Sequence, residues 1–231
     1  MRLRWHLPLL LVALGAPLSG QAAVIVIDPG HPSEVSSGAT IQNGTSEVHI
    51  AWLVALRLTR LLKAHGYRVE MTKSAERQMV TNIARAEVGN RAHAALEVRL
   101  HCDASSDSGY AIYFPDRPGT AHGRTGPSET IMRASGAAAE SMHVSMARIL
   151  GNRLKDGGVR GDGKTAVGST QGALTGSIFS EVPVVLVEMV TLSNPRDARF
   201  IKGVAGQTMM AQAIADGIAR YVPSATSRRK Q

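Results

Sequence analysis

Short runs of β-branched and other apolar residues recur along the chain, and longer amphipathic stretches separate the first of them. The apolar runs have the length and composition of buried strands, whereas the stretches between them carry apolar residues at helical spacing. An order of strand, helix, strand, helix and strand is typical of a parallel sheet with right-handed crossovers. We therefore predict an α/β fold, a single domain with a mostly parallel twisted sheet flanked by helices.

The predicted elements can be placed by residue range, with glycine and proline marking several of their ends. We expect strands at 23–28, 67–71, 96–101, 109–115 and 183–188, and helices at 46–65, 81–93, 136–155 and 204–221. We expect loops at 29–45, 116–130 and 156–180, and a turn that opens at Asn194–Pro195. The segment 156–180 is long for a loop, and loops of that length usually serve as a lid or a substrate wall.

The first 23 residues have the features of a secretory signal peptide. Arg2 and Arg4 are followed by an apolar core of about twelve residues, too short to cross a bilayer, and then by small residues. We expect cleavage after Ala22 or Ala23, no stable membrane span, and a periplasmic or secreted protein; a retained anchor is the alternative. At the other end, residues 223–231 form a basic tail that we expect to be disordered.

The formal net charge of +8 suits an anionic surface such as a cell wall or a lipid headgroup layer. Nucleic acid would fit the charge equally well, but no recognition motif supports it, so we expect no nucleic-acid partner. Cys102 is the only cysteine, which excludes a disulfide framework. We interpret Cys102 as a small buried residue at a strand end rather than as a nucleophile.

Candidate chemistry gathers where the predicted strands end. His31 follows the first strand, His101 ends the third, Glu188 ends the last, and Glu47 lies in the first turn of the first helix. The carboxyl ends of parallel strands meet at one edge of a sheet, where ligands bind. Two imidazoles and a carboxylate form the ligand set of a catalytic zinc with one open position, and a further glutamate beside them suits a general base.

These residues also lie in motifs, and through them the chain from 24 to 221 resembles the zinc-dependent N-acetylmuramoyl-L-alanine amidases of bacterial cell walls. The matching motifs are Asp28-Pro-Gly-His31, Glu47, Leu100-His-Cys-Asp-Ala104, Leu186-Val-Glu188 with Ser193-Asn194, and the pair Arg85 and Asn90. The resemblance implies a zinc amidase catalytic domain over residues 24–222, with His31, Glu47 and His101 binding zinc and Glu188 catalytic. It also implies a peptidoglycan substrate, cut between N-acetylmuramic acid and L-alanine.

The chain departs from the family pattern at several positions. Pro32-Ser33 replaces the two glycines that usually follow the first histidine, and Asp103 stands where asparagine is common. Arg99 replaces a small residue two positions before His101, and Lys73 stands where arginine is usual. Because the three metal ligands and Glu188 are all retained, these changes affect the expected substrate contacts and pH optimum more than the metal site.

Two other functions compete with this one. The chain could be a non-catalytic or regulatory peptidoglycan-binding protein on the same fold, or a zinc amidase that acts on a different amide. We expect a monomer. We also expect an openly accessible site, because the segment after Phe114 is short for an insert that would block it. A protein that activates or targets this one is the alternative to unassisted action. The other histidines we interpret as structural or solvated, with His122 alone kept as a candidate substrate contact: they are His49, His65, His93, His122 and His143.

Overall fold

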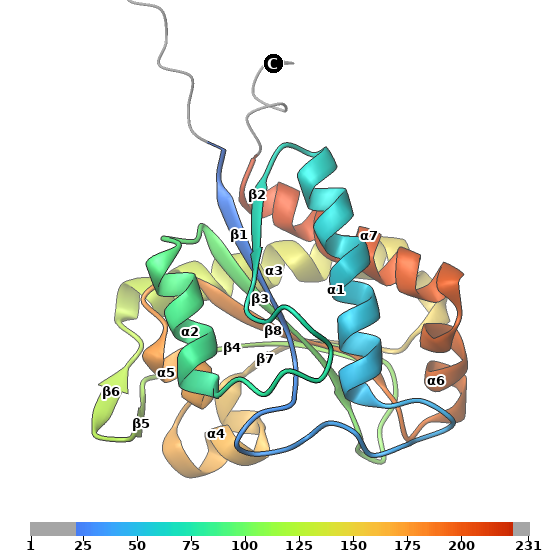
Figure 1. Cartoon of the computed structure of the whole chain (residues 1–231), viewed down its shortest axis with the longest axis horizontal. Helices are drawn as coiled ribbons and strands as arrows, with labels where there is room; N and C mark the ends of the chain where they lie inside the picture. The colour runs from blue at the N-terminus through green and yellow to red at the C-terminus, as the bar shows by residue number, and fades with distance from the viewer. Residues whose placement is uncertain (1–21, 224–231) are drawn as a thin grey trace, which may run out of the picture.

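A computed structural model of the protein describes residues 22–223 (Figure 1). Its main sheet has six strands in the order β2-β1-β3-β8-β4-β7. Strands β2, β1, β3 and β8 run parallel, β4 is antiparallel to β8, and β7 is parallel to β4. The α/β class with a mostly parallel sheet is therefore confirmed. The strands are β1 (Val24–Pro29), β2 (Arg68–Met71), β3 (Leu96–Asp103), β4 (Tyr110–Phe114), β7 (Asp156–Gly161) and β8 (Val184–Thr191).

One face of the sheet packs against long helices and forms the main hydrophobic core. Alternate strand residues such as Ile25, Val98 and Val187 point to this face and are fully or almost fully buried. Leu58 of the first helix and Met142 of the third are also wholly buried in this core. The helices are α1 (Glu47–Ala64), α3 (Glu129–Leu150), α6 (Pro195–Lys202) and α7 (Val204–Tyr221).

The opposite face of the sheet carries the polar side chains. Asp28, Arg99 and Leu186 lie side by side in register on three adjacent strands, and His101 lies beside Glu188 one pleat further on. Shorter helices and a small hairpin belong to this side of the molecule (Figure 1). They are α2 (Asn82–Arg91), α4 (Ala166–Gln171), α5 (Thr175–Phe179), and the hairpin of β5 (Gly119–Ala121) and β6 (Arg124–Gly126).

Several predicted element boundaries were wrong. The third helix begins at Glu129 rather than near residue 136, because Ser128 caps it by accepting a hydrogen bond from the backbone of Ile131. The predicted loops contain structure: residues 116–130 include the hairpin, and 156–180 include β7, α4 and α5. The turn at Asn194 opens the helix α6, since its side chain accepts hydrogen bonds from two backbone amides.

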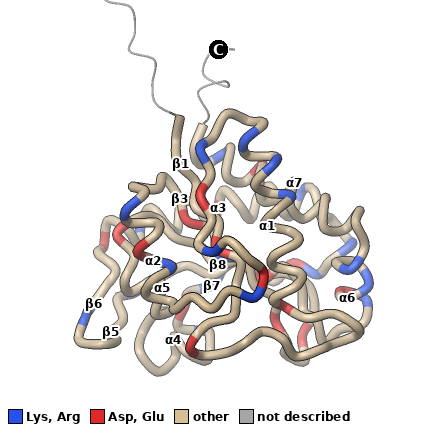
Figure 2. The backbone as a smooth tube through the Cα atoms, in the orientation of Figure 1, with Lys and Arg blue, Asp and Glu red and all other residues tan. Residues whose placement is uncertain are grey.

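Strands β3 and β8 also extend beyond their predicted ends, to Asp103 and Thr191, which pair with each other. His101 and Glu188 are therefore two and three residues inside their strands rather than at the ends. The predicted signal peptide, except Ala22 and Ala23, lies outside the described residues, as does the tail after Pro223. Within residues 22–223, no helix is both long and apolar enough to span a membrane. Figure 2 shows lysines and arginines along α1 and α6.

Candidate metal centre and active site

Three separate segments bring His31, Glu47 and His101 together. His31 follows β1 in a left-handed backbone conformation, Glu47 is the first residue of α1, and His101 lies near the end of β3. Close packing needs glycine at two positions: a Cβ at Gly30 would lie 2.6 Å from the His101 ring, and one at Gly38 would lie 2.5 Å from the Cβ of His31. The sequence therefore leaves room for the two imidazoles to approach each other.

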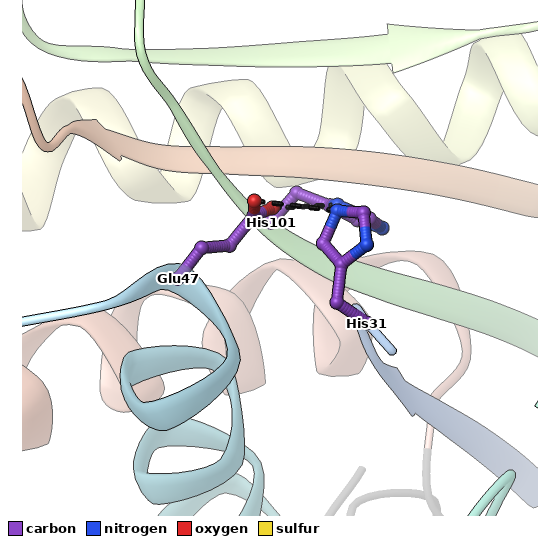
Figure 3. A group of neighbouring side chains, drawn as sticks. All are labelled: His31, Glu47 and His101. Carbon is purple, nitrogen blue, oxygen red and sulfur yellow. Dashed lines mark hydrogen bonds and ion pairs between the residues drawn. The ribbon is translucent and has the colours of Figure 1, made fainter. Parts of the chain in front are cut away.

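The carboxylate of Glu47 bridges the two imidazoles (Figure 3). Oε1 of Glu47 lies 2.8 Å from Nδ1 of His101, and Oε2 lies 3.2 Å from Nε2 of His31. The two rings are 5.0 Å apart at an interplanar angle of 82°. Glu47 also accepts a hydrogen bond from the backbone amide of Cys102 at 3.2 Å, which fixes its side chain over the end of β3.

Burial and hydrogen bonding set the protonation of this cluster. Burial alone would raise the pKa of Glu47, but hydrogen bonds from His101 and His31 outweigh it and hold that pKa well below its ordinary value. Burial lowers the pKa of His101 despite its contact with Glu47. An ionised carboxylate and a neutral imidazole are the forms that bind metal.

The donor set fits a divalent metal, and zinc in particular. One ligand atom from each of the three residues lies within 4.8 Å of the others. Nε2 of His101 is buried and has no hydrogen-bond partner among residues 22–223, while Nδ1 of His31 lies 3.0 Å from the carbonyl oxygen of Ser36, which orients that ring. Two histidines and a glutamate are a known ligand set of catalytic zinc, with a fourth position left for water or substrate.

Glu188 lies beside His101 in the sheet. Both residues line a cavity of about 180 Å³, which His31 also lines. Oε2 of Glu188 is buried without a hydrogen-bond partner in the part of the chain that the structure describes. Burial, together with the negative charges of Glu47 and Asp103, raises the pKa of Glu188 well above its ordinary value. A carboxyl group with a raised pKa next to a metal site can both accept and return a proton near neutral pH.

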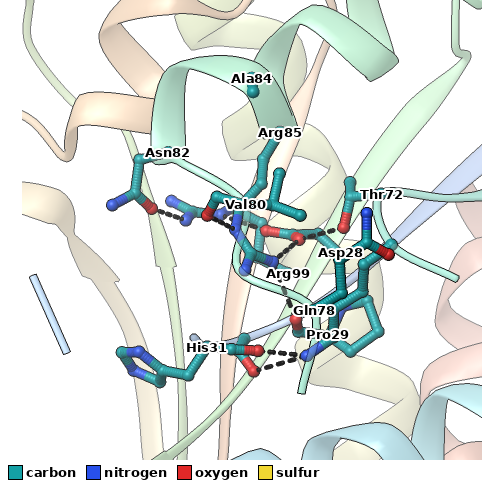
Figure 4. A network of polar contacts seen from close by, with 12 residues as sticks. Asp28, Pro29, His31, Thr72, Gln78, Val80, Asn82, Ala84, Arg85 and Arg99 are labelled. Atoms are coloured by element: carbon teal, nitrogen blue, oxygen red, sulfur yellow. Dashed lines mark hydrogen bonds and ion pairs between the residues drawn. The ribbon is translucent and has the colours of Figure 1, made fainter. Parts of the chain in front are cut away.

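A buried polar network beside the cluster could not be predicted from the sequence (Figure 4). The carboxylate of Asp28 accepts hydrogen bonds from Thr72 and Arg85 at 2.5 Å and from Arg99 at 3.0 Å. Lys73 donates to the backbone carbonyl of His31, which links the same region to the loop that carries this histidine. The motifs contained Asp28 and Arg85, and Arg99 stood out as a departure from the family pattern, but nothing in the sequence joined these three residues.

The segment 156–180 does supply part of the cavity wall, through Thr165, Val167, Leu174 and Thr175. His122 does not line this cavity; it lies in the turn of the small hairpin, 6.3 Å from the ring of Phe179. His49 points instead to Glu76, at 3.2 Å. Cys102 is buried, and burial raises the pKa of its thiol, as expected for a residue that only packs.

The fold and the cluster together define a class of protein: a single α/β domain with a candidate metal site at one edge of its mostly parallel sheet. The sequence from 25 to 220 matches the family N-acetylmuramoyl-L-alanine amidase. The chain belongs to this family, and amidase activity on peptidoglycan is the activity that the match supports. These findings confirm the resemblance recognised in the motifs.

Individual relatives agree with the family match. The amidase AmiA of Escherichia coli is 24% identical over 229 residues, which cover 89% of this chain and 78% of AmiA. The catalytic domain of the amidase CwlV from Bacillus (Paenibacillus) polymyxa superposes with a TM-score of 0.69 at 25% identity, covering 87% of this chain and 98% of that domain. The CwlD amidase from Clostridioides difficile, solved in complex with the GerS lipoprotein, has the same fold. The TM-score is 0.66 at 20% identity, and the match covers 87% of this chain and 98% of CwlD.

Proposed function

We propose that the protein is a zinc-dependent peptidoglycan amidase that cleaves the bond between N-acetylmuramic acid and L-alanine. His31, Glu47 and His101 would hold the zinc, and Glu188 would act as general base and then as general acid. The observation that carries the proposal is the cluster of two imidazoles bridged by one carboxylate, with an unpartnered buried glutamate on the neighbouring strand. The family match supplies the substrate class.

When bound, zinc would polarise the substrate carbonyl and lower the pKa of water towards about 7. The protein residues have separate tasks. Glu188 takes a proton from the attacking water and delivers it to the leaving nitrogen, which otherwise leaves poorly as an amide anion. Its burial favours this double role, because a carboxylate of ordinary pKa is too weak a base to take the proton from water. Glu47 keeps both imidazoles oriented and supplies the negative charge of the ligand set.

We place the protein outside the cytoplasm, as the signal-like first 23 residues predict, and assign the catalytic domain to residues 24–222. The site would be accessible without a displaced segment, since none of the described hairpin residues 119–126 lines the cavity. The complex of CwlD with a lipoprotein makes a protein partner a specific alternative to unassisted action. Sacculi should therefore be digested with the purified protein alone, so that unassisted action is tested.

The test is mass spectrometry of the soluble products released from purified sacculi, with and without a chelator. The expected products are stem peptides with a free N-terminal L-alanine, released by the zinc-loaded protein and absent after chelation. Products with new reducing sugar ends, or peptides cut at another amide, would contradict the proposed bond. Binding to sacculi without any release would favour the peptidoglycan-binding alternative.

A further inference from the structure

The cavity beside the metal cluster combines apolar walls with two buried arginines, Arg85 and Arg99, that the proposed mechanism does not use. Its apolar walls are formed by Val35, Val167, Leu174 and Leu186. Arg99 also lines this cavity, together with His101 and Glu188. Since β3 places Arg99 and His101 on the same face, the guanidinium lies next to the region where the scissile amide would bind.

Two contacts hold the Arg99 guanidinium in place. Nε donates to Oδ2 of Asp28 at 3.0 Å, and Nη2 donates to Oδ1 of Asn82 at 2.5 Å (Figure 4). Only 4% of the side chain is exposed. The group is therefore fixed before any ligand arrives, which lowers the entropy cost of binding to it.

The third nitrogen of the Arg99 guanidinium, Nη1, differs from Nε and Nη2. Within residues 22–223, Nη1 makes no hydrogen bond to a protein acceptor, although arginine carries five N–H donors. A Cβ at Gly176 would lie 2.7 Å from Nη1, so the absence of a side chain at this position leaves the space that the guanidinium occupies. Because Arg99 lines the cavity, the donors of Nη1 are available to an acceptor that a ligand brings there.

Arg85 provides a contrast within the same network. Its guanidinium donates to Asp28 and to the backbone carbonyls of Val80, Pro29 and Pro32, so the protein itself supplies its acceptors. Both arginines share the single carboxylate of Asp28.

Two further acids face Arg99, but neither forms an ion pair with it. Glu97 and Asp162 both affect its electrostatics, yet no carboxylate oxygen of either lies within 4.0 Å of its nitrogens. Burial raises the pKa of Asp162, and burial together with the charge of Asp28 raises the pKa of Glu97 to about 8. Among residues 22–223, Asp28 is therefore the one carboxylate that pairs with Arg99, and Arg85 shares it.

We propose that Arg99 is a specificity residue that binds a free carboxylate on the peptide side of the substrate. The inference rests on the proposed function. In the muramoyl part of that substrate, the lactyl carboxyl group is consumed in the scissile amide, so free carboxylates occur only in the peptide. An arginine fork in an apolar cavity matches a carboxylate in both geometry and charge. The peptide that leaves with L-alanine then lies over Arg99 and Leu186, and acidic stem peptides are preferred over amidated ones.

The experiment compares two ligands of nearly equal shape, N-acetylmuramoyl-L-alanyl-D-glutamate and its diamide, in which both carboxylates are carboxamides. Binding is measured by calorimetry on the zinc-loaded Glu188→Gln variant, so that hydrolysis does not interfere. We expect the acid to bind at least tenfold more tightly than the diamide, about 1.4 kcal/mol. Adding Arg99→Gln should bring the two affinities to within about twofold of each other, and the two monoamides then identify which carboxylate is bound.

A second variant and a control separate recognition from loss of folding. Gly176→Ala leaves Asp28 with both of its arginines but displaces Nη1, so it should also reduce the preference for the acid. Arg124→Gln removes one positive charge at a partly exposed position outside the cavity and should leave the preference unchanged. Equal binding of acid and diamide, no binding of the acid at millimolar concentration, or an unchanged preference in Arg99→Gln would overturn the proposal. Because binding is measured without turnover, these results stand even if sacculi yield no products.

Discussion

Asp28 is the shared counter-ion of two buried arginines, and its replacement by asparagine should strongly destabilise the fold. Asp28 is completely buried, and the side chains of Arg85 and Arg99 are 1% and 4% exposed. Asparagine preserves the volume and one oxygen, but it leaves two guanidinium charges with no carboxylate between them. Breaking a buried ion pair by removing one partner costs about 3–5 kcal/mol.

That cost is large compared with the stability of a typical domain, about 5–15 kcal/mol. For a domain of this size, it corresponds to a fall in Tm of about 6–20 °C. The assay is urea and thermal unfolding of Asp28→Asn and wild type at neutral pH, followed by far-UV circular dichroism. The midpoint in urea should fall without a change in slope, since the surface exposed on unfolding stays the same.

A surface ion pair provides the matched control. Lys155 and Asp107 are 2.6 Å apart, similar to the contacts of Asp28, but both side chains are exposed. Asp107→Asn should leave the unfolding midpoint unchanged within error, because water screens exposed pairs. If Asp28→Asn and Asp107→Asn shifted the midpoint equally, burial would not determine the contribution of the network, and our reasoning would be refuted.

The pH dependence of this effect has a defined sign. Burial alone would raise the pKa of Asp28, but the charges of Arg85 and Arg99 outweigh it and hold that pKa far below its ordinary value. Since the folded state then binds the proton more weakly than the unfolded state, the stabilisation is present above about pH 4 and declines on acidification. The difference between wild type and Asp28→Asn should therefore shrink as the pH falls below about 4.

Three further predictions concern other parts of the fold. Burial raises the pKa of Glu97 from 4.5 to about 8, so folding becomes less favourable as the pH rises between these values. The Tm of Glu97→Gln should therefore exceed that of wild type by a margin that grows as the pH rises from 5 to 8.5. A constant difference in Tm over this range would contradict the prediction. A Cβ at Gly217 would lie 2.6 Å from the Cα of Met142. Gly217→Ala should therefore lower the free energy of unfolding by about 1–3 kcal/mol, although alanine has the better helix propensity. A rise in Tm would refute the close contact. The hydroxyl of Ser135 accepts a hydrogen bond from the buried amide of Val184 at 3.0 Å; Ser135→Ala should cost about 1–3 kcal/mol in urea unfolding, and no shift would mean that the bond is dispensable.

Local patterns in the sequence predicted much of this fold. The apolar runs around Val26 and Val98 and the amphipathic stretch that begins near Glu47 gave the parallel sheet and its first helix, and the last helix has the predicted bounds. The failures have local causes. Ser128 and Glu129 form a capping sequence, but the neighbouring glycines and prolines made the segment look like a loop. Strand β8 continues past Glu188. The side chain of Glu188 faces the cavity, and the next residue, Met189, packs in the hydrophobic core on the other face of the sheet.

The candidate site was predictable only in part. The positions of His31, Glu47 and His101 followed from strand ends, the first helix turn and the motif resemblance, and the structure brings these three side chains together. The partners of Asp28 were not predictable, because Thr72, Arg85 and Arg99 come from three separate segments whose pairing depends on the register of the folded sheet. The sequence could mark Arg99 as unusual, but only the structure places it against Asp28 in the cavity wall.

The central claim is that one cluster binds the metal while a separate glutamate performs the proton transfer. The most direct measurement is a zinc titration of wild type, His101→Ala, Glu47→Ala and Glu188→Gln, with hydrolysis of sacculi measured on the same samples. His49→Ala is the control, since His49 lies two residues from Glu47 but contacts Glu76.

We predict one zinc per chain in wild type and in His49→Ala, and zinc affinity weakened by at least about 100-fold in His101→Ala and Glu47→Ala. Glu188→Gln should keep the zinc and lose about 100- to 10,000-fold in turnover. Full zinc affinity in His101→Ala and Glu47→Ala, or near wild-type turnover in Glu188→Gln, would contradict the account.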